Sequence, residues 1–329
     1  MLRLPTFLFA GAVLVGSANA SEEASPLVLE ETIPLPNVSG RIDHLAIDLE
    51  RGHLFIAELG NGTVDVVDLR TKKSSARILG LDEPQGIAYL ATLNLLVVAC
   101  GGDGAVKFYD GGTLEEKGVV ELQNDADNVR VDPQSGKVLV GYGDGAIAVI
   151  DPAGPTKVAD IPLPGHPEGF QLSLATSRIY VNVPDVDEID VLDFAATTPV
   201  GSWKITDYSS NFPMANLSSR QNVAVAFRSP ARIALFDVAG NRTSEAKTCG
   251  DADDLFFDEK RAQLYVTCGA GLVETFHIDA DGIRAIGQTA TGSGARTSLF
   301  VTELDRLYVA VPAGWLGSDA SVQVLRPSS

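Results

Sequence analysis

One aspartate recurs along this chain at nearly constant spacing, and that spacing limits the possible folds more than any other feature. Five copies stand 42, 41, 42 and 44 residues apart: Asp68, Asp110, Asp151, Asp193 and Asp237. Each copy ends a short run of alternating β-branched and other residues, such as VDVVD over residues 64–68. A second apolar run, such as residues 54–57, lies about ten residues earlier, across a turn that bears Gly or Pro. Such pairs of runs predict antiparallel hairpins.

A repeat of ~40–45 residues built from four strands is typical of a β-propeller blade. A sixth unit has His277 where the aspartate stood, and a seventh runs through Leu307 to Leu325 with an inserted loop. The seventh unit lacks its outermost strand, and residues 28–35 have the composition to supply it. Such closure removes the open edge of the ring. We therefore predict an all-β fold, a seven-bladed β-propeller closed by an N-terminal strand.

The first twenty residues differ from the repeats. Arg3 precedes an apolar stretch over residues 7–15, and small residues follow up to Ala20. A basic start, a short apolar run and small residues predict a secretory signal peptide, cleaved after Ala20. The apolar run is shorter than the ~20 residues that a membrane span requires. We therefore predict a signal peptide over residues 1–20, a propeller over residues 21–329, a periplasmic location and no membrane span.

Acidic residues dominate the charge of the chain. It carries 43 Asp and Glu against 25 Lys and Arg, a formal net charge of −18. Binding to nucleic acid or to an anionic membrane needs clustered Lys and Arg, so this balance disfavours both. We expect a monomer whose partner is a small molecule or a periplasmic protein.

The three cysteines suit an oxidising compartment. Alignment of the units places Cys249 at the end of the outer strand of the fifth blade and Cys268 at the end of the second strand of the sixth. Both ends lie on the same face of the ring, so we predict a disulfide between them. Cys100 has no obvious mate, and we expect a free, buried thiol.

The run Tyr265-Val266-Thr267-Cys268, echoed over residues 180–182 and 307–310, resembles the YVTN repeat. Together with the export signal, the whole chain after that signal resembles the YncE-like family of bacterial exported seven-bladed propellers. The resemblance implies a periplasmic propeller, and it transfers no catalytic motif onto these positions. The fold itself hosts binding proteins, lyases and hydrolases alike.

The loops that lead into the innermost strands vary in charge, while the strands stay aliphatic. In a propeller these loops ring one mouth of the central channel. Aligned on the strands, they give an inner ring of Asp43, Gln85, Asp127, Glu168, Phe212, Asp253 and Arg296. Two residues earlier they give an outer ring of Arg41, Glu83, Asp125, His166, Ser210, Asp251 and Gly294.

Packing needs the same residues in every blade, whereas a ligand needs different groups at different angles. This contrast predicts a polar ligand site formed by Arg41, Asp43, His44, Gln85, Asp127, Arg130, His166, Glu168, Asp253 and Arg296. Two structural explanations stay open. Aspartate also satisfies backbone donors in turns, and ion pairs between blades could occupy Arg41 and Arg296.

Hard oxygen ligands in the mouth suit a divalent cation such as calcium or magnesium. The candidate metal ligands are Asp43, Asp127, Glu168 and Asp253. Only four histidines occur in the chain, with His53 at the opposite face and His277 in a turn, so a multi-histidine copper cluster is not available. The sequence does not identify a cofactor, and a divalent cation is one candidate.

Three functions fit these observations. The first is a non-enzymatic protein that binds a ligand or partner at the mouth. The second is a metal-assisted, lactonase-like hydrolase or a lyase acting there on a small molecule, and the third is an accessory to a periplasmic redox or metal and cofactor system. The chain lacks a Gly-x-Ser-x-Gly elbow and a Cys-x-x-Cys-His haem motif, which favours the first.

Overall fold

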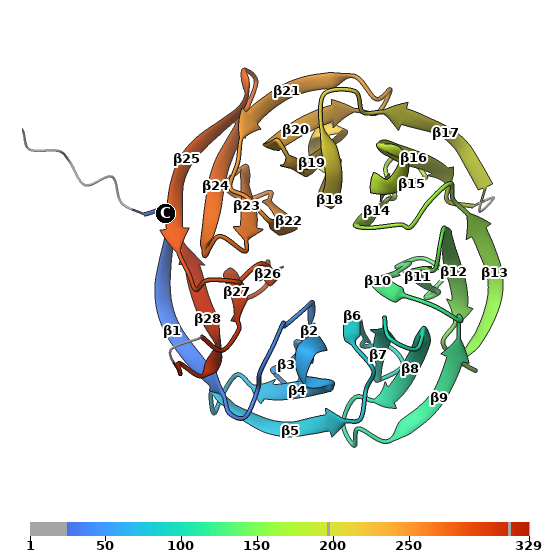
Figure 1. Ribbon diagram of the computed structural model, residues 1–329, viewed down its shortest axis with the longest axis vertical. Coiled ribbons are helices and arrows are strands. Elements are labelled where there is room, and N and C mark those ends of the chain that lie inside the picture. The colour runs from blue at the N-terminus through green and yellow to red at the C-terminus, as the bar shows by residue number, and fades with distance from the viewer. Residues whose placement is uncertain (1–24, 196–197, 315–316, 329) are drawn as a thin grey trace, which may run out of the picture.

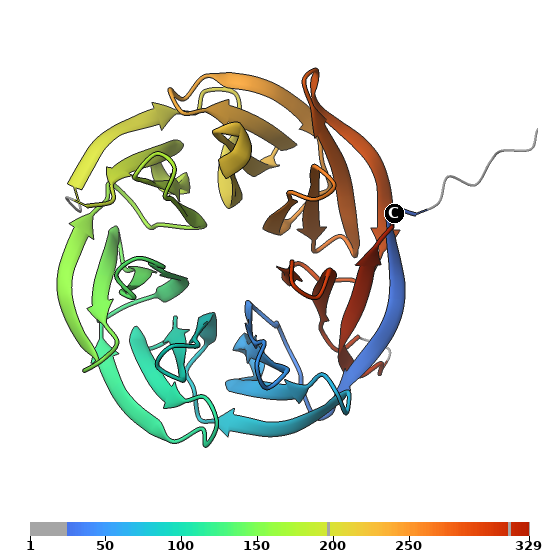
Figure 2. The same ribbon diagram turned by 180° about the vertical axis from the view of Figure 1, so that it is seen from behind.

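The computed structural model of the chain describes residues 25–195, 198–314 and 317–328. Within these ranges, 28 strands form seven four-stranded antiparallel sheets. The sheets stand as blades around a central opening, seen from one face in Figure 1 and from the other in Figure 2. The predicted seven-bladed propeller is confirmed. The predicted signal peptide lies outside the described residues and stays a prediction, and no helix in the described ranges is long and apolar enough to cross a membrane.

Each blade places its first strand at the channel and its last at the rim. Blades one and two hold β2 (Leu45–Asp48), β3 (His53–Glu58), β4 (Thr63–Asp68), β5 (Lys73–Leu79), β6 (Pro84–Leu90), β7 (Leu95–Cys100), β8 (Ala105–Asp110) and β9 (Glu116–Glu121). Blades three and four hold β10 (Ala126–Val131), β11 (Val138–Tyr142), β12 (Ala146–Asp151), β13 (Thr156–Pro162), β14 (Phe170–Ser173), β15 (Arg178–Val183), β16 (Glu188–Asp193) and β17 (Thr198–Lys204).

The remaining blades follow the same order. Blades five and six hold β18 (Ser209–Leu217), β19 (Asn222–Ser229), β20 (Ala231–Asp237), β21 (Arg242–Lys247), β22 (Ala252–Asp258), β23 (Gln263–Cys268), β24 (Leu272–Asp279) and β25 (Gly282–Ala290). Blade seven holds β26 (Ser298–Val301), β27 (Arg306–Val311), β28 (Ala320–Pro327) and β1 (Leu27–Leu35). Three short 3-10 helices lie between strands: η1 (Leu59–Asn61), η2 (Pro184–Val186) and η3 (Ser218–Arg220).

The ring closes through β1, which pairs antiparallel with β28. Figure 1 shows this N-terminal strand, in blue, beside the red C-terminal strands. Glu30 of β1 lies 2.6 Å from both Arg306 and Arg326, and Leu27 and Ile33 are buried. Apolar burial and a shared ion pair thus attach the closing strand, which covers the edge of β28 that would otherwise be open.

The hydrophobic core lies between neighbouring blades. Leu54 and Ile56 of β3, for example, pack in one buried cluster with Tyr308 and Val322 of blade seven. Each such side chain contributes roughly 1.5–3 kcal/mol of stability when buried. Because every blade must fill the same space, the second and third strands keep their aliphatic residues along the whole chain.

The recurring aspartate supports the turn between the third and fourth strands of a blade. Asp110 accepts backbone hydrogen bonds from Gly112 at 2.9 Å and from Thr113 at 2.8 Å. These bonds, that of Thr113 first, hold the pKa of Asp110 below its usual range. In blade six, Asp279 takes this role two residues after His277, with a 2.9 Å bond from the backbone of Asp281. The repeat therefore marks turns and carries no chemistry.

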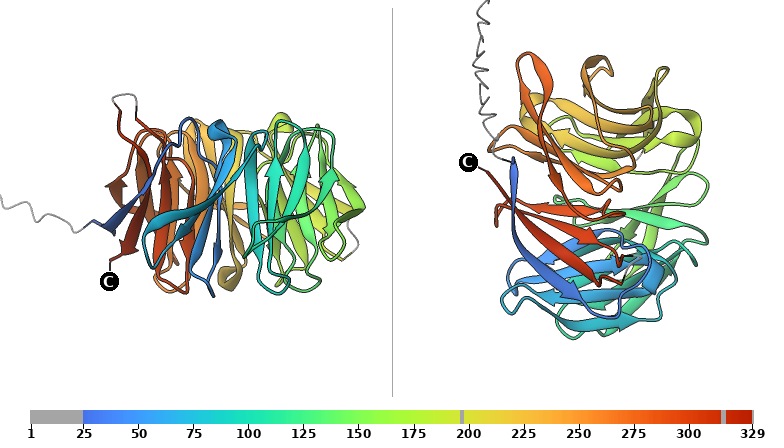
Figure 3. Two further views of the ribbon diagram at one scale, coloured as in Figure 1. Left: turned by 90° about the horizontal axis from the view of Figure 1, so that it is seen from below. Right: turned by 60° about the vertical axis from the view of Figure 1, so that its left-hand side comes forward.

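The strands run across the disc, so their turns gather on its two faces (Figure 3). The loops into the innermost strands share one face with the turns between second and third strands. The backbone of Gly60, in one such turn, donates a 2.9 Å hydrogen bond to the carbonyl of Arg41, in one such loop. We call the channel opening on this face the mouth.

Candidate functional site

A narrow polar cavity of about 50 Å³ lies inside the mouth. Five blades contribute to its wall, which consists of Arg41, Asp43, His44, Asp127, Asn128, Arg130, Glu168, Gly169, Gln171, Phe212, Pro213, Met214, Asp253, Asp254, Leu255 and Phe256. Seven of the ten predicted ligand-binding residues are among them: Arg41, Asp43, His44, Asp127, Arg130, Glu168 and Asp253. Residues far apart in sequence thus meet in one cavity, which we call the upper chamber.

A wider space of about 370 Å³, the lower chamber, follows along the channel. It shares six wall residues with the upper chamber: His44, Arg130, Gln171, Asp254, Leu255 and Phe256. Its other wall residues are mainly apolar: Leu45, Ile87, Val129, Ala215, Asn216, Phe257, Ser298 and Leu299. The channel wall therefore becomes less charged and more apolar away from the mouth.

Bulges at the start of the innermost strands decide which side chains reach the channel. The pairing of β10 with β11 shifts register between Ala126 and Val129, and similar shifts occur in β6, β18 and β22. A bulge breaks the strict alternation of side chains along a strand. Asp127, Asn128 and Arg130 can therefore all line the upper chamber from a single strand.

Two glycines let the innermost strands approach each other closely. A Cβ on Gly86 would lie 1.9 Å from the carbonyl oxygen of Asp127, and one on Gly169 would lie 2.5 Å from that of Phe212. The amide of Gly169 also donates a 3.1 Å hydrogen bond to Phe212. Any other residue at these two positions would push neighbouring blades apart and displace the mouth residues.

Arginines neutralise the carboxylates on the side of the mouth that belongs to blades five to seven. Arg228 contacts Asp253 at 2.5 Å, and Arg41 reaches the same carboxylate at 3.4 Å. Arg296 lies 2.9 Å from Asp251. Burial, against the opposing charge of Arg228, raises the pKa of Asp253 to about 6.

Arg228 is not among the predicted residues, because it lies outside the loops into the innermost strands. Arg228 stands near the end of β19, next to the turn between the second and third strands of blade five. These turns share the mouth face, so a basic residue beside one of them was the available signal. Its guanidinium also lies 3.8 Å from the centre of the Phe212 ring.

On the side of blades three and four, two carboxylates have no such partner. Asp127, only 9% exposed, accepts a 3.3 Å hydrogen bond from the side chain of Asn128. Within the described residues, no basic side chain lies within 4.0 Å of Asp127 or Glu168. Burial first, and then the charge of Asp43, raises the pKa of Asp127 to about 7. Burial and the charge of Asp253 do the same for Glu168.

His44 lies between the two sides as a partly buried cation. Its Nδ1 lies 3.5 Å from Asp254 and its Nε2 lies 3.6 Å from Asp43. Burial alone would lower the pKa of His44, but Asp254 and then Asp43 outweigh it and raise that pKa to about 10. His44 is therefore protonated at neutral pH and forms part of the charge balance of the mouth.

Arg130 lies where the two chambers meet, because it lines both. Its guanidinium donates hydrogen bonds to the carbonyl of Val129 at 2.8 Å and to Asn128 at 3.4 Å, and it lies 5.4 Å from the centre of the Phe170 ring. Burial lowers the pKa of Arg130, against the attraction of Asp254 and Asp127. It makes no ion pair within 4.0 Å among the described residues.

Three predicted residues, Gln85, His166 and Arg296, stand outside the wall of the upper chamber. The side chain of Gln85 packs against Gly101 of its own blade. The Nδ1 of His166 forms a 2.7 Å hydrogen bond with the carbonyl oxygen of Gly143 in the neighbouring blade. Arg296 is occupied by Asp251, as one structural explanation had anticipated.

The outer ring has a backbone role in five blades. Glu83, Asp125, Ser210, Asp251 and Gly294 all have positive φ, between 39° and 82°. This left-handed conformation favours Gly, Asn and Asp over other residues. At these positions the variation in charge therefore tells less about a ligand than it does in the inner ring.

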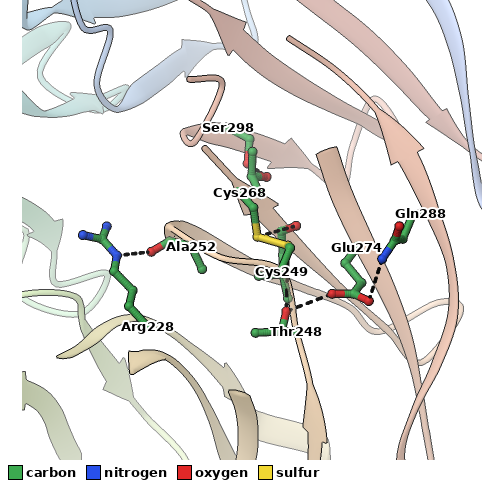
Figure 4. Close-up of a disulfide and its surroundings, with 10 residues drawn as sticks. Arg228, Thr248, Cys249, Ala252, Cys268, Glu274, Gln288 and Ser298 are labelled. Atoms are coloured by element: carbon green, nitrogen blue, oxygen red, sulfur yellow. Dashed lines mark hydrogen bonds between the residues drawn. A yellow bond between two sulfur atoms is a disulfide. The ribbon is translucent and has the colours of Figure 1, made fainter. Parts of the chain in front are cut away.

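The predicted disulfide is confirmed, with a Cα–Cα distance of 6.1 Å between Cys249 and Cys268. It ties the loop that carries Asp251 to the end of β23 (Figure 4). Beside it, Thr248 and Gln288 each donate a 3.1 Å hydrogen bond to Glu274. This side of the mouth is thus fixed covalently as well as by charge.

Cys100 is free and buried, as expected. Burial raises the pKa of its thiol to about 12, so the thiol stays protonated at neutral pH. A protonated, buried thiol is a poor nucleophile. Cys100 therefore acts as a small apolar residue of the core.

The predicted metal ligands do not form a coordination shell by themselves. Within the described residues, no group of three or more His, Cys, Asp and Glu side chains is placed to hold a metal ion. Asp43 and Asp253 both pair with Arg41, whose positive charge stands where a cation would compete for them. The metal site stays a prediction that needs a direct test.

Comparison with known proteins supports the fold alone. No protein family and no curated protein matches the chain. A chain of the hydrazine synthase of Kuenenia stuttgartiensis is similar in structure, with a TM-score of 0.76, 16% identity, and coverage of 92% of this chain and 99% of that one. A chain of a mitotic checkpoint complex has a TM-score of 0.77, 14% identity, and coverage of 100% and 99%. One neighbour comes from an enzyme and the other from a protein assembly, so the fold leaves the function open.

Proposed function

We propose that this protein is an exported binding propeller whose upper chamber holds the positively charged group of a small molecule. One observation carries the proposal. Asp127 and Glu168 face the same cavity and have no basic partner within 4.0 Å among the described residues. The other carboxylates of the cavity do have one: Arg41 contacts Asp43, Arg41 and Arg228 contact Asp253, and His44 contacts Asp254. Asp127 is buried and Glu168 is partly buried. Two carboxylates so placed without a basic partner repel each other, and a cation from outside relieves that repulsion.

The size of the cavity favours a small molecule over a protein surface. About 50 Å³ in the upper chamber accommodates a functional group such as an ammonium, not a folded interface. Stable protein interfaces bury a far larger area, roughly 800 Å² on each partner. A protein partner would have to insert a single basic side chain into this chamber.

Export to the periplasm is part of the proposal. The sequence of the first twenty residues, the resemblance to YncE-like propellers and the Cys249–Cys268 disulfide support it. Fractionation of cells that produce the full chain, followed by mass measurement of the mature N-terminus, tests the cleavage after Ala20. Mature protein found in the cytoplasm with residues 1–20 intact would contradict it.

Binding is tested with small amines as probes. We expect methylamine and 3-methylbutylamine to bind the purified protein at pH 8 in isothermal titration calorimetry. The double variant Asp127→Asn/Glu168→Gln should weaken both by about tenfold or more, because each charged hydrogen bond is worth about 1.5–3 kcal/mol. Both substitutions keep the shape of the side chain and remove only its charge.

A matched control removes two carboxylates elsewhere. Glu121→Gln/Glu303→Gln has the same net charge as the test variant, and both glutamates are exposed. It should bind the amines as the wild type does. Equal weakening in both double variants would show that overall charge attracts the amines, and the chamber would lose its assigned role.

A further inference from the structure

We propose that the ligand is an α-amino acid with an apolar side chain. Its ammonium group would contact Asp127 and Glu168, its carboxylate would contact Arg130, and its side chain would occupy the lower chamber. This inference rests on the proposed cation site and adds to it an anion site and an apolar site. A separate observation supports each of the three sites.

Arg130 differs from the other arginines at the mouth. Arg41, Arg228 and Arg296 each contact two carboxylates within 4.0 Å. Arg130 contacts none within the described residues, although it lines both chambers. Its hydrogen bonds to Val129 and Asn128 come from its own strand and use two of its five N–H donors.

A guanidinium held in this way is suited to a ligand carboxylate. Its planar donors match the two oxygens of a carboxylate, and its charge is permanent. The hydrogen bonds within β10 and the ring of Phe170 fix its orientation before any ligand arrives. A preorganised group of this kind loses little entropy on binding.

The lower chamber has a mixed wall and holds most of the apolar wall residues of the site. Leu45, Ile87, Val129, Leu255 and Leu299 are among its wall residues. Its volume of about 370 Å³ lies at the small end of the ~300–1,000 Å³ typical of ligand pockets. Apolar wall residues favour a hydrocarbon side chain, and each buried methylene is worth about fourfold in affinity.

The charges of the two chambers also fit a zwitterion. The carboxylates left without a basic partner, Asp127 and Glu168, line the upper chamber, and the arginine left without an acidic partner stands at its junction with the lower one. An amine alone would leave Arg130 unmatched, and a carboxylate alone would leave the two acids unmatched. A molecule that carries both groups satisfies all three residues.

Four compounds separate the contributions by calorimetry at pH 8. L-leucine carries all three groups, 3-methylbutylamine lacks the carboxylate, 4-methylpentanoate lacks the amine and glycine lacks the side chain. We expect L-leucine to bind at least about tenfold more tightly than each of the others, because each lost contact is worth about 1.4 kcal/mol or more.

One variant tests whether Arg130 binds the carboxylate of the ligand. Arg130→Met removes the guanidinium and keeps an apolar stem. It should weaken L-leucine by about tenfold. 3-Methylbutylamine should bind at least as tightly as it binds the wild type, because the variant removes a positive charge that attracts Asp127. Retained binding of this amine also shows that the variant is folded.

The position of the ligand side chain is tested independently, with L-selenomethionine as a ligand in crystals of the wild type. Anomalous scattering from selenium in the lower chamber would support the proposal. If 3-methylbutylamine binds the wild type as tightly as L-leucine, the carboxylate site is wrong and the cation site stands. If neither compound binds, or if selenium lies outside the channel, both proposals fail.

Discussion

The two sides of the mouth differ in whether a basic side chain neutralises their carboxylates. Towards blades five to seven, Asp253 is held by Arg228 and Arg41, and a disulfide anchors the adjoining loop. Towards blades three and four, Asp127 and Glu168 face the cavity without a basic side chain within 4.0 Å among the described residues. In the free protein, Asp253 on the first side is therefore already paired. Asp127 and Glu168 on the second side can still bind a cationic ligand.

This difference locates the site more narrowly than the acidic character of the whole mouth does. A carboxylate already paired with arginine gains little from a second cation, because its desolvation has been compensated. A buried carboxylate without a partner gains the most, and its raised pKa expresses that cost. We therefore expect substitutions on the first side to change stability and those on the second side to change binding.

The largest effect should follow the loss of an arginine on the paired side. Arg228→Met leaves Asp253 with the longer, 3.4 Å contact to Arg41. We expect a loss of about 3 kcal/mol of unfolding free energy. Arg130→Met removes an arginine without an ion pair and should cost only about 1 kcal/mol. Urea denaturation of both variants measures the difference. Equal losses would mean that the two sides are not distinct.

Removal of the disulfide should have an effect of similar size. Cys249→Ser/Cys268→Ser opens a link with a sequence separation of 19 residues, which should cost about 3 kcal/mol. Hydrogen exchange should rise in the loop that carries Asp251 and stay unchanged around Asp127. A uniform rise over both loops would show that the bond stabilises the whole ring and does not anchor one side.

The fold could be predicted almost completely from the sequence, because each blade needs the same strands and the same packing. The closing strand and the disulfide followed from the same alignment of repeats. The site could be predicted only in part. Asp127 and Glu168 reach the cavity as expected, but Gln85 turns towards Gly101.

The bulges explain why the rest of the site could not be predicted from the sequence. A register shift at the start of an innermost strand changes which side chains face the channel, and no residue type marks that shift in the sequence. Arg228 was missed for another reason. It belongs to a second strand, which the repeat alone assigns to the core, and only the geometry of the mouth face brings it beside Asp253.

A smaller effect is expected from removing the unpaired charges. The carboxyls of Asp127 and Glu168 have their pKa raised to about 7 in the folded protein. The folded state therefore holds more protons than the unfolded state between about pH 4 and 7, and stability falls as the pH rises through that range. Above pH 7 both groups are charged and their repulsion is complete.

Asp127→Asn/Glu168→Gln should therefore stabilise the protein at pH 8, by about 1 kcal/mol, and have little effect at pH 4. Urea denaturation at the two pH values measures the change. Asp253→Asn on the paired side should instead destabilise the protein at pH 8, since it leaves Arg228 with only its longer, 3.7 Å contact to Asp251. A double variant that is less stable than the wild type at pH 8 would show that these carboxylates have partners of their own.

The smallest effect should come from metal ions. We expect chelator-treated protein to melt within about 1 °C of its own value when calcium, magnesium, zinc or copper is added, because a cation that binds only weakly adds little stability. Arg41 already contacts Asp43 and Asp253. Of the four predicted metal ligands, Asp127 and Glu168 are therefore the two without a basic side chain within 4.0 Å among the described residues. Two carboxylates without further ligands fall short of the six to eight oxygens that calcium takes. A rise of several degrees with one metal, absent in Asp127→Asn/Glu168→Gln, would reverse this conclusion and make a metal ion the cation of the upper chamber.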